Sequence, residues 1–304
     1  MRKFYLLIKK DEKVNKLKKV IGLFLRTKLS RLLSDETFLK IQYKYVTGEK
    51  LNLDNPQSFN EKLQYLKIEQ REPIFTEVAD KFKVREYVSR TIGQEYLIPL
   101  YGVYDSFDEI NFQDLPDEYV IKTNHNSGGY FLVPDSEKVN INDARSKLEP
   151  MLKKNYYYFT REWPYKNIKP KLICEKYLRE NDDMELRDYR FFCFNGEVKF
   201  IAVDLSIVDK SKVRRNLYDK NWKLLEEEIS YERDLTEKIP KPKNLSEMID
   251  LAEKLSSKFK HVRVDLYNIN NKIYFGELTM YHQSGYGDIR PQSFNKLMGS
   301  WIKL

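Results

Sequence analysis

The amino-acid sequence predicts an α+β fold, in which antiparallel hairpins and helices follow one another in blocks. Two hairpins carry this prediction. The dipeptide Asn195-Gly196 separates apolar runs at 188–195 and 197–205 and is typical of a tight hairpin turn. Over 261–279, apolar and charged residues alternate on both sides of an asparagine-rich turn. Helices are expected before, between and after these hairpins.

The N-terminal segment is basic and is predicted to form an amphipathic helix. Residues 1–34 hold eleven of the 54 Lys and Arg residues and two of the 46 acidic residues, so the rest of the chain is close to neutral. Apolar residues at helical spacing lie opposite the basic ones. Such a helix lies on an anionic membrane, docks on a partner, or packs on its own domain with its basic side in water.

A capping box begins the next helical region. Ser58 and Glu61 have the spacing that satisfies backbone N–H groups at the start of a helix. Residues 35–75 are therefore expected to form a small helical cap. Asp80 can cap a further helix, which would end before Gly93.

The remaining elements follow from apolar periodicity and from turn residues. Strands are expected at 119–123, 129–133, 171–177, 188–195, 197–205, 213–218 and 221–225. Helices are expected at 142–154, 246–259 and 291–303. The sequence shows no internal repeat and no low-complexity linker.

The composition indicates a folded protein in a reducing compartment. A chain of 304 residues with 41% hydrophobic residues can build one large or two smaller cores. Cys174 and Cys193 lie in apolar runs, where buried free thiols are expected. No apolar run approaches the roughly 20 residues that span a bilayer, so we expect a cytoplasmic protein. The nearly neutral body of the chain argues against nucleic-acid binding.

Three charged residues stand in the apolar hairpin at 261–279. They are Arg263, Asp265 and Glu277. Charged side chains are seldom buried unless they are paired or bind a metal. One interpretation is therefore an internal ion pair or a solvated hairpin face. The other is a metal site, because the turn brings the two carboxylates into rough cross-strand register.

Further motifs precede this hairpin. Lys122 lies on an expected strand and is followed by the small, flexible loop at 126–129, whose backbone N–H groups can wrap phosphate oxygens. The same loop pattern is also common in plain hairpin turns. A later apolar strand ends in Glu175 and Lys176. It either presents backbone groups to a flat adenine ring or is an ordinary buried strand.

In this order the motifs resemble the ATP-grasp superfamily, and most closely its TupA-like branch of teichuronopeptide and surface-polysaccharide biosynthesis. The segments that resemble motifs of that branch are NPQSFNEKLQYLK, ADKFKVREYV, IGQEYLIPLYGVY, LPDEYVIKTNHNSGG, DYRFFCFNGEVKFI, LYDKNW and GELTMYHQSG. The likeness covers roughly residues 35–300. It implies an ATP-grasp fold, in which two α+β subdomains grip ATP. Here a helical cap replaces the Rossmann-like domain that usually precedes them.

The resemblance also implies the domain boundaries and the cofactors, ATP and Mg²⁺. The basic segment would span 1–34, the cap 35–75, the N-terminal subdomain 76–180 and the C-terminal subdomain 181–304. Two lysines, a glycine-containing flap and a hinge strand would bind the nucleotide. These residues are Lys81, Lys122, Asn126, Ser127, Gly128, Gly129, Glu175, Lys176, Tyr177 and Leu178.

The resemblance implies metal and catalytic residues in the same way. The implied metal ligands are Asp265, Glu277 and Thr279. Thr279 stands where many members carry asparagine, so a weaker or different second-ion site is expected. Arg263 would stabilise the transferring phosphoryl group, with Arg190 and His125 as further catalytic candidates. The alternative for His125 is a structural hydrogen bond.

Candidates for the acceptor substrate are less specific. They are Arg214, Arg215 and His282. The alternative for the two arginines is a solvated strand edge. The carboxylate-substrate site of the family often draws on the domain that is missing here, so the resemblance leaves the substrate open.

The function implied is an ATP-dependent ligase that joins a carboxylate to an amine through an acyl phosphate. The carboxylate would belong to a uronic acid or similar group of a bacterial capsule or surface polysaccharide, free or lipid-linked, and the nucleophile would be an amine or amino acid. Contact of residues 1–34 with the inner face of the membrane would suit a lipid-held precursor. The alternatives are a kinase of a sugar or polysaccharide precursor and a glycosyltransferase of the same pathway.

Overall fold

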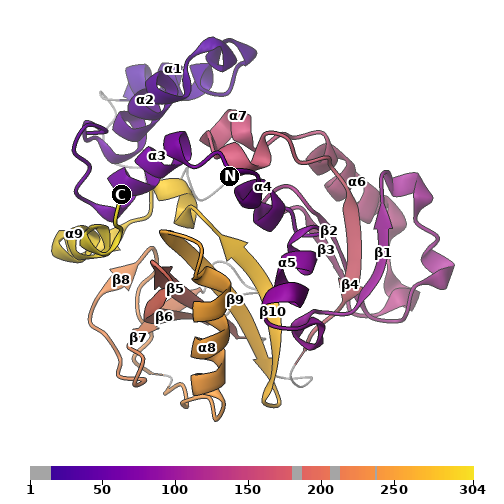
Figure 1. Ribbon diagram of the computed structural model, residues 1–304. Helices are drawn as coiled ribbons and strands as arrows, with labels where there is room; N and C mark the ends of the chain where they lie inside the picture. The colour runs from indigo at the N-terminus through magenta and orange to yellow at the C-terminus, as the bar shows by residue number, and fades with distance from the viewer. Residues whose placement is uncertain (1–14, 180–186, 206–212, 237) are drawn as a thin grey trace.

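Two antiparallel sheets with covering helices form the body of the molecule (Figure 1). The computed structural model describes residues 15–179, 187–205, 213–236 and 238–304, and every structural statement concerns this part of the chain. The first sheet has the strand order β1-β4-β2-β3 and the second β10-β9-β5-β6-β7, while β8 pairs with β11. The α+β prediction is confirmed.

The elements have the following bounds. The helices are α1 (Asn15–Phe24), α2 (Asp35–Thr47), α3 (Phe59–Glu69), α4 (Pro73–Ala79), α5 (Val84–Thr91), α6 (Ile141–Leu152), α7 (Tyr157–Thr160), α8 (Leu245–Ser256) and α9 (Gln292–Trp301). The strands are β1 (Leu100–Tyr104), β2 (Tyr119–Thr123), β3 (Tyr130–Val133), β4 (Leu172–Lys176), β5 (Asp188–Phe194), β6 (Glu197–Leu205), β7 (Arg214–Tyr218), β8 (Glu228–Ile229), β9 (His261–Ile269), β10 (Lys272–Thr279) and β11 (Ile289–Arg290). The 3₁₀ helices include η2 (Lys28–Leu32), η7 (Trp163–Tyr165) and η8 (His282–Gly285).

The two predicted hairpins both belong to the second sheet. Asn195 and Gly196 have φ angles of 49° and 81°. Asn270 and Asn271, between β9 and β10, have φ angles of 51° and 64°. Two successive left-handed residues are the signature of a type I′ turn, and asparagine and glycine tolerate this conformation best. The local sequence therefore accounts for both turns.

Two expectations of local structure are wrong. Residues 221–225 form a turn, with Trp222 at φ 69° and a single isolated bridge in place of a strand. The helix expected at Asp80 begins instead at Val84. The Asp80 carboxylate accepts a hydrogen bond from the backbone N–H of Phe82 at 2.9 Å and so caps a turn.

The first sheet has its own core. Side chains of β2, β4 and α6 meet there, among them Tyr119, Cys174 and Leu148. Both cysteines are buried free thiols, as expected. β1 has no counterpart among the expected strands. It lies half-exposed at the sheet edge, and Gly102 interrupts any apolar alternation along it.

The helical cap packs mainly on the second sheet. The capping box at the start of α3 is present, with Glu61 N–H donating to the Ser58 hydroxyl and Ser58 N–H donating to the Glu61 carboxylate. Leu63 and Leu66 of α3, and Val88 of α5, then join the core of the second sheet. The predicted boundary at residue 76 groups α5 with the first sheet, whereas its apolar face contributes to the other core.

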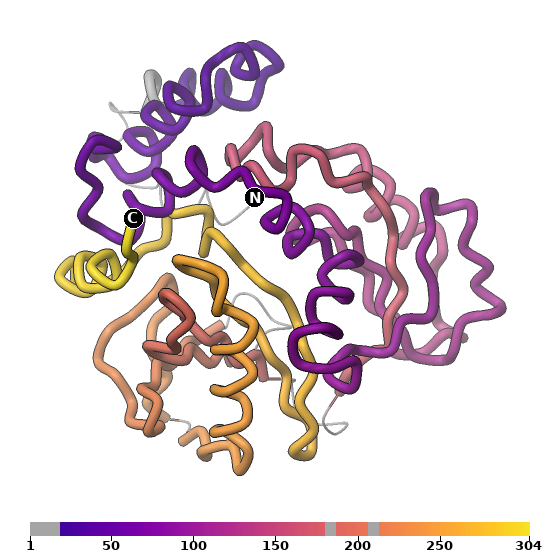
Figure 2. Tube along the Cα trace, viewed as in Figure 1, coloured from indigo at the N-terminus to yellow at the C-terminus, as the bar shows by residue number. Residues whose placement is uncertain are grey.

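The C-terminal helix lies beside α3 (Figure 2). Their approach is close because Gly299 has no side chain. A Cβ atom there would lie 2.1 Å from the carbonyl oxygen of Gln57. The C-terminal end of the chain therefore closes over the start of the cap helix.

Candidate functional site

A bulge in β10 brings the carboxylates of the hairpin face to face. Phe275 pairs with Leu266 across the hairpin. The next pair is Glu277 with Asp265, which leaves Gly276 as the extra residue of the bulge. Because side chains alternate along a strand, Glu277 would otherwise share the core face of Phe275. A Cβ at position 276 would lie 3.0 Å from the carbonyl oxygen of Asp265, which favours glycine there.

Arg263 on β9 bridges these two carboxylates. Its Nε and Nη2 donate to Asp265 at 2.6 and 2.5 Å, and Nη2 also donates to Glu277 at 2.9 Å. Its Nη1 donates to Nδ1 of His282 at 2.7 Å. The three charged residues of the hairpin therefore form ion pairs with one another, and the metal site stays a prediction.

The ion pairs continue across the second sheet. Arg190 on β5 donates to Asp188 at 2.8 and 2.6 Å, and its Nη1 lies 3.0 Å from Asp204 on β6. Asp204 accepts from Arg215 on β7 at 2.5 and 2.8 Å. The Nε of Arg190 also lies 3.7 Å from Asp265, which joins this set to the hairpin. Buried charges need such partners, because each costs several kcal/mol to desolvate.

The two arginines on β7 differ in their surroundings. Arg215 belongs to the set of ion pairs on β5, β6 and β7, whereas Arg214 does not. Arg215 is 1% exposed and its guanidinium is held by Asp204, so the expectation that it binds an anionic substrate is wrong. Arg214 is half-buried, and its guanidinium lies 4.0 Å from Glu232. Adjacent strand residues point to opposite faces. The two arginines therefore lie on opposite faces of β7, and only the packing of the sheet decides which of them is buried.

The carboxylates of the site differ in how readily they ionise. Burial raises the pKa of Asp265 to about 7, although the Arg263 guanidinium acts in the opposite direction. Burial alone would raise the pKa of Glu277, but Arg263, Lys81 and Arg190 outweigh it and hold this pKa at about 2. Burial likewise opposes ionisation of Asp204, and its two arginine neighbours lower that pKa to about 2. Ionised carboxylates are the form that a metal ion requires.

Lys81 reaches the flap from the turn before α5. Its Nζ donates to the carbonyl oxygen of Asn126 at 2.6 Å, and its backbone N–H donates to that of Asn124 at 3.0 Å. Burial lowers the pKa of Lys81, Glu277 raises it and Lys122 lowers it further. Lys81 therefore lies within electrostatic range of both Lys122 on the first sheet and Glu277 on the hairpin of the second sheet, while its ammonium contacts the predicted flap.

Lys122 and Glu175 form a second ion pair, on neighbouring strands of the first sheet. The Lys122 ammonium lies 2.5 Å from the Glu175 carboxylate. The guanidinium of Arg85 donates to the same carboxylate at 3.0 Å. Arg85 is not among the site residues that the sequence predicts, although it follows Lys81 by four residues in the motif ADKFKVREYV. Beyond Glu175, Lys176 is exposed, and Tyr177 and Leu178 are half-buried.

The predicted flap has a rigid base and an exposed tip. The Asn126 side chain is buried, accepts from the Thr123 hydroxyl at 2.5 Å and donates to the carbonyl oxygen of Met151 at 3.0 Å. A Cβ at Gly129 would lie 2.2 Å from the Thr123 hydroxyl oxygen. Ser127 and Gly128 are exposed, and Gly128 has a left-handed φ of 81°. The tip of the loop is therefore exposed, whereas the side-chain amide of Asn126 is held in place.

Two histidines have structural partners. His125 is buried, with Nδ1 3.1 Å from the side-chain oxygen of Asn124 and Nε2 3.1 Å from the carbonyl oxygen of Lys154. Burial lowers the pKa of His125, which favours its neutral form. His282 is also buried and accepts from Arg263, so the expectation that it faces an open acceptor pocket is wrong. Its hydrogen bond restrains the Arg263 guanidinium on the side away from the two carboxylates.

Solved structures similar to this chain include several ligases. A D-alanine–D-alanine ligase from Bacillus anthracis is 19% identical, with a TM-score of 0.39 over 67% of this chain and 57% of that one. An L-amino acid ligase from Bacillus licheniformis is 13% identical, with a TM-score of 0.44 over 83% and 56%. The ATP-grasp ligase PsnB is 8% identical, with a TM-score of 0.43 over 95% and 74%. This chain thus spans about half the length of the first of them.

A comparison with curated proteins gives no match. The family model described as TupA-like ATPgrasp matches residues 61–303, which is most of the chain. The matched span includes most of α3, both sheets, the predicted flap and the charged hairpin. The chain therefore belongs to the TupA-like ATP-grasp family.

Proposed function

We propose that this protein is an ATP-dependent ligase that activates a carboxylate as an acyl phosphate and joins it to an amine. The observation that carries the proposal is the pair Asp265 and Glu277, bridged by Arg263 and in electrostatic contact with Lys81. Carboxylates, an arginine fork and lysines on one site are the groups that hold and transfer a phosphoryl group. Membership of the ATP-grasp family supports the same chemistry.

The donor set fits a magnesium ion. Asp265 and Glu277 oppose each other on one sheet face, and Mg²⁺ favours one or two carboxylates completed by phosphate oxygens. Within the described ranges, no group of three or more His, Cys, Asp or Glu side chains could hold a metal alone. The nucleotide would therefore supply further ligands. Thr279, whose hydroxyl donates to Glu277 at 3.0 Å, would orient that carboxylate. When bound, the ion would neutralise charge on the γ-phosphate.

The reaction has two steps. An oxygen of the acceptor carboxylate attacks the γ-phosphorus of ATP, and ADP leaves. The amine nitrogen then attacks the acyl carbon, inorganic phosphate leaves, and the nitrogen loses a proton. We assign Lys81 and Lys122 to the ATP phosphates, and Arg263 and Arg190 to the charge on the transferring group. Positioning and charge stabilisation would supply most of the rate enhancement.

The substrate we propose is the carboxylate of a uronic acid or a similar group in a bacterial surface polysaccharide or capsule. The TupA-like branch supports this setting, and an amine or amino acid would be the nucleophile. The reaction would take place in the cytoplasm. ATP and Mg²⁺ would be the cofactors.

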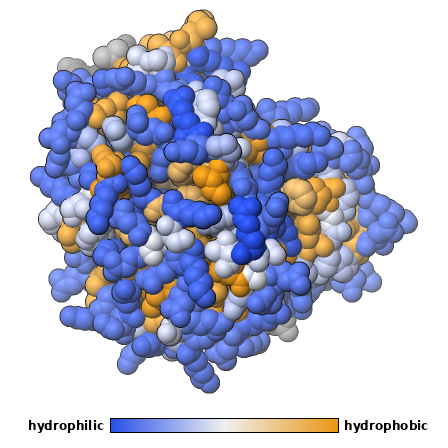
Figure 3. All heavy atoms as spheres, viewed as in Figure 1, coloured by the Kyte–Doolittle hydropathy of each residue, from blue (hydrophilic) through white to orange (hydrophobic). Residues whose placement is uncertain are grey.

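We also propose that the N-terminal helices rest on the inner face of an anionic membrane. Val20, Leu23, Leu29 and Leu32 are exposed, the last at 85%. Hydrophobic atoms gather at the top of the molecule in Figure 3, over these helices. Basic residues such as Arg26 accompany them, so both apolar insertion and charge favour an anionic surface. Among the described helices, none has the length and apolar character to cross a bilayer.

Liposome co-sedimentation tests this placement. The wild type should bind vesicles that contain an anionic lipid and should not bind neutral ones. The double variant Leu29→Ser, Leu32→Ser should lose this binding and keep its fold. Equal binding by wild type and variant would disprove the contact.

Calorimetry with a non-hydrolysable ATP analogue and Mg²⁺ tests the ATP site. The wild type should bind, whereas Lys122→Met and Glu277→Gln should bind at least tenfold more weakly. The first variant loses a positive charge at the phosphates, and the second loses a carboxylate that would hold the magnesium ion. Lys296→Met, an exposed substitution on α9, serves as a matched control and should bind like the wild type. Failure of the wild type to bind any adenine nucleotide would overturn the proposal.

Product analysis distinguishes the ligase from its alternatives. A ligase supplied with an acidic saccharide and an amine releases ADP and phosphate in equal amounts, and added hydroxylamine traps the acyl phosphate as a hydroxamate. A sugar kinase releases ADP without free phosphate. A glycosyltransferase would bind a sugar nucleotide instead of ATP.

A further inference from the structure

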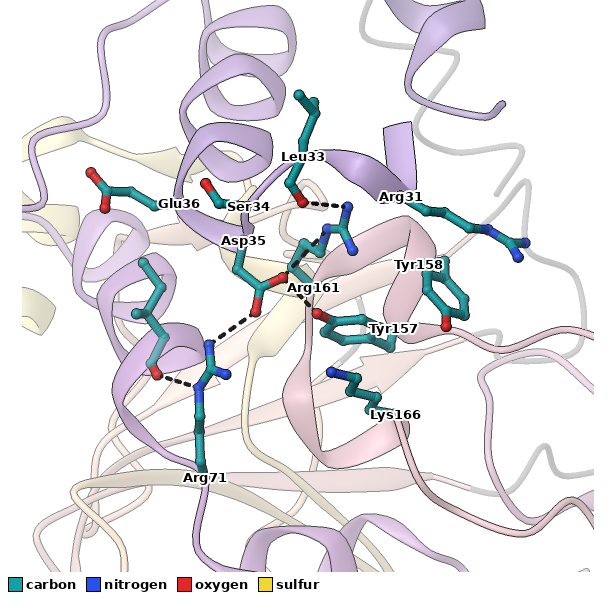
Figure 4. A pocket seen from close by; sticks show the side chains of 11 residues that line it. Arg31, Leu33, Ser34, Asp35, Glu36, Arg71, Tyr157, Tyr158, Arg161 and Lys166 are labelled. Atoms are coloured by element: carbon teal, nitrogen blue, oxygen red, sulfur yellow. Dashed lines mark hydrogen bonds and ion pairs between the residues drawn. The ribbon is translucent and has the colours of Figure 1, made fainter. Parts of the chain in front are cut away.

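A pocket of about 530 Å³ lies outside the site described above, between α2 and the segment that contains α7 and η7 (Figure 4). Ligand-binding pockets for small molecules commonly have volumes of roughly 300–1,000 Å³. Its lining includes residues of η2, α2, α3, α7 and η7 or their flanks. The residues that matter here are Arg31, Asp35, Arg71, Tyr158, Arg161 and Lys166.

Asp35 organises the floor of the pocket. Its carboxylate accepts from the Tyr157 hydroxyl at 2.6 Å and from Nη2 of Arg71 at 2.9 Å, as Figure 4 shows. It also lies 3.7 Å from Nε of Arg161. Arg161 is buried and donates to the carbonyl oxygen of Ser30 at 2.7 Å. One carboxylate thus ties together the helical cap and the α7 segment, and the floor is preorganised.

Aromatic rings hold the other cations of the pocket. The Lys166 ammonium lies 4.4 Å from the ring centre of Trp163 and 5.0 Å from that of Tyr157. No carboxylate of the described residues lies within salt-bridge distance of it. The Arg31 guanidinium lies 4.2 Å from the ring centre of Tyr158. Such contacts restrain long side chains, so a ligand would lose little entropy in ordering them.

The lining combines cations with one carboxylate, and this combination selects the ligand. Four cationic side chains and the carboxylate of Asp35 line the pocket, so it carries a net positive charge and favours an anion. The Glu36 carboxylate points away from them in Figure 4 and pairs with Lys40. The Asp35 carboxylate would repel a phosphate or polyphosphate, which offers it few donors. It can accept hydrogen bonds from hydroxyl groups. A ligand with one carboxylate and several hydroxyls satisfies both kinds of group.

The segment that lines this pocket also borders the phosphate-facing site. Tyr156 and Tyr165 pack edge to face, with ring centres 5.3 Å apart. Burial, then Glu162 and then Glu277 raise the pKa of both tyrosines, so both lie within electrostatic range of the hairpin carboxylate. Their neighbours in the chain, at positions 157 and 166, line the pocket. The segment that lines the pocket therefore also carries side chains within electrostatic range of Glu277.

We propose that this pocket binds an acidic sugar residue of the acceptor saccharide. Its carboxylate would be held by Lys166 and Arg71, and one of its hydroxyls would donate to Asp35. That this saccharide is the acceptor substrate rests on the proposed ligase function. Its binding to the pocket does not depend on that function. A saccharide bound here would extend from the pocket toward the phosphates with a neighbouring sugar unit.

Calorimetry without nucleotide tests the proposal, with trigalacturonic acid as the probe. We expect the wild type to bind it and to ignore maltotriose, a neutral saccharide of the same length. Lys166→Met keeps the aliphatic stem on Trp163 and should lower the affinity by about tenfold, as expected for loss of one charge-assisted hydrogen bond. Arg31→Gln is a second pocket variant with the same expected direction. Lys296→Met, on α9, should bind like the wild type.

Competition identifies the kind of anion. Excess inorganic phosphate should not displace trigalacturonic acid, and displacement at equal concentration would assign the pocket to phosphate and overturn the proposal. Absence of binding, or equal binding by the Lys166→Met variant, would overturn it as well. Failure of the ligase function would look different, because the ATP analogue would not bind while the acidic trisaccharide still bound. The reverse result, ATP binding without saccharide binding, would refute the pocket and leave the ligase in place.

Discussion

Lys67 donates hydrogen bonds from its ammonium to both the carbonyl and the hydroxyl oxygen of Ser284, each at 2.8 Å. The lysine side chain is fully buried, and it also donates to the carbonyl oxygen of Thr160 at 2.9 Å. Ser284 lies in η8 with a left-handed φ of 56°. The same short turn carries His282, which contacts Arg263. Lys67 therefore holds the turn behind the candidate site.

The first prediction is that Lys67→Met destabilises the protein by about 3 kcal/mol, because it removes a buried donor from the carbonyl oxygens of Thr160 and Ser284 and from the Ser284 hydroxyl. The measurement is the free energy of unfolding from denaturant titration. Lys296→Met, an exposed substitution, should change it by less than about 0.5 kcal/mol. A loss below about 1 kcal/mol for Lys67→Met would show that the turn does not depend on this lysine.

The second prediction concerns how the free energy of unfolding changes in acid because of Asp204, which pairs with Arg190 and Arg215. The folded-state pKa of Asp204 is about 2, below its ordinary value of 3.8. A lowered carboxyl pKa means that its contribution is fully present above about pH 4 and is lost as the pH falls toward 2. The difference corresponds to about 2 kcal/mol. Unfolding free energies from pH 5 to 2 should fall less steeply in Asp204→Asn than in the wild type, and parallel curves would contradict the prediction.

The third prediction is that Gly276→Ala weakens binding of the ATP analogue with Mg²⁺. The added Cβ would crowd the carbonyl oxygen of Asp265, so the bulge must shift and Glu277 with it. We expect at least a fivefold loss of affinity in calorimetry. Gly48→Ala is the matched control, since a Cβ at Gly48 meets nothing within 4 Å and only its left-handed φ is strained. Unchanged binding by Gly276→Ala would show that the bulge does not position the site.

The fourth prediction concerns the hydroxyl beside the hairpin carboxylate. Thr279→Val keeps the shape of the side chain but removes the hydrogen bond to Glu277. We expect the Mg²⁺ concentration that half-saturates binding of the ATP analogue to rise about threefold, since a hydrogen bond that orients a metal-binding carboxylate is lost. Thr279→Asn, which restores the residue common in the family, should lower it. If both variants match the wild type, position 279 has no part in the site.

Local signals in the sequence determined much of the fold. The pairs Asn195-Gly196 and Asn270-Asn271 and the capping box of α3 depend on φ preference and on side chains that bond their own backbone, so a short stretch of sequence suffices. The cross-strand pairing of Asp265 with Glu277 followed from the turn between them. Its exact register did not, because the bulge at Gly276 leaves no signal other than a glycine.

The sequence by itself thus determined the α+β fold, the main hairpins and the family to which the chain belongs. Only the tertiary structure decided which charged side chains are partners and which face open pockets. Glu175 lies 90 residues from Arg85, and Arg161 lies 131 residues from Ser30, yet each pair is in contact. Such contacts depend on how distant elements pack. Local propensity does not encode that packing. The sequence therefore suggested Arg215 and His282 as substrate-binding residues, whereas the packing of the second sheet and of η8 buries both.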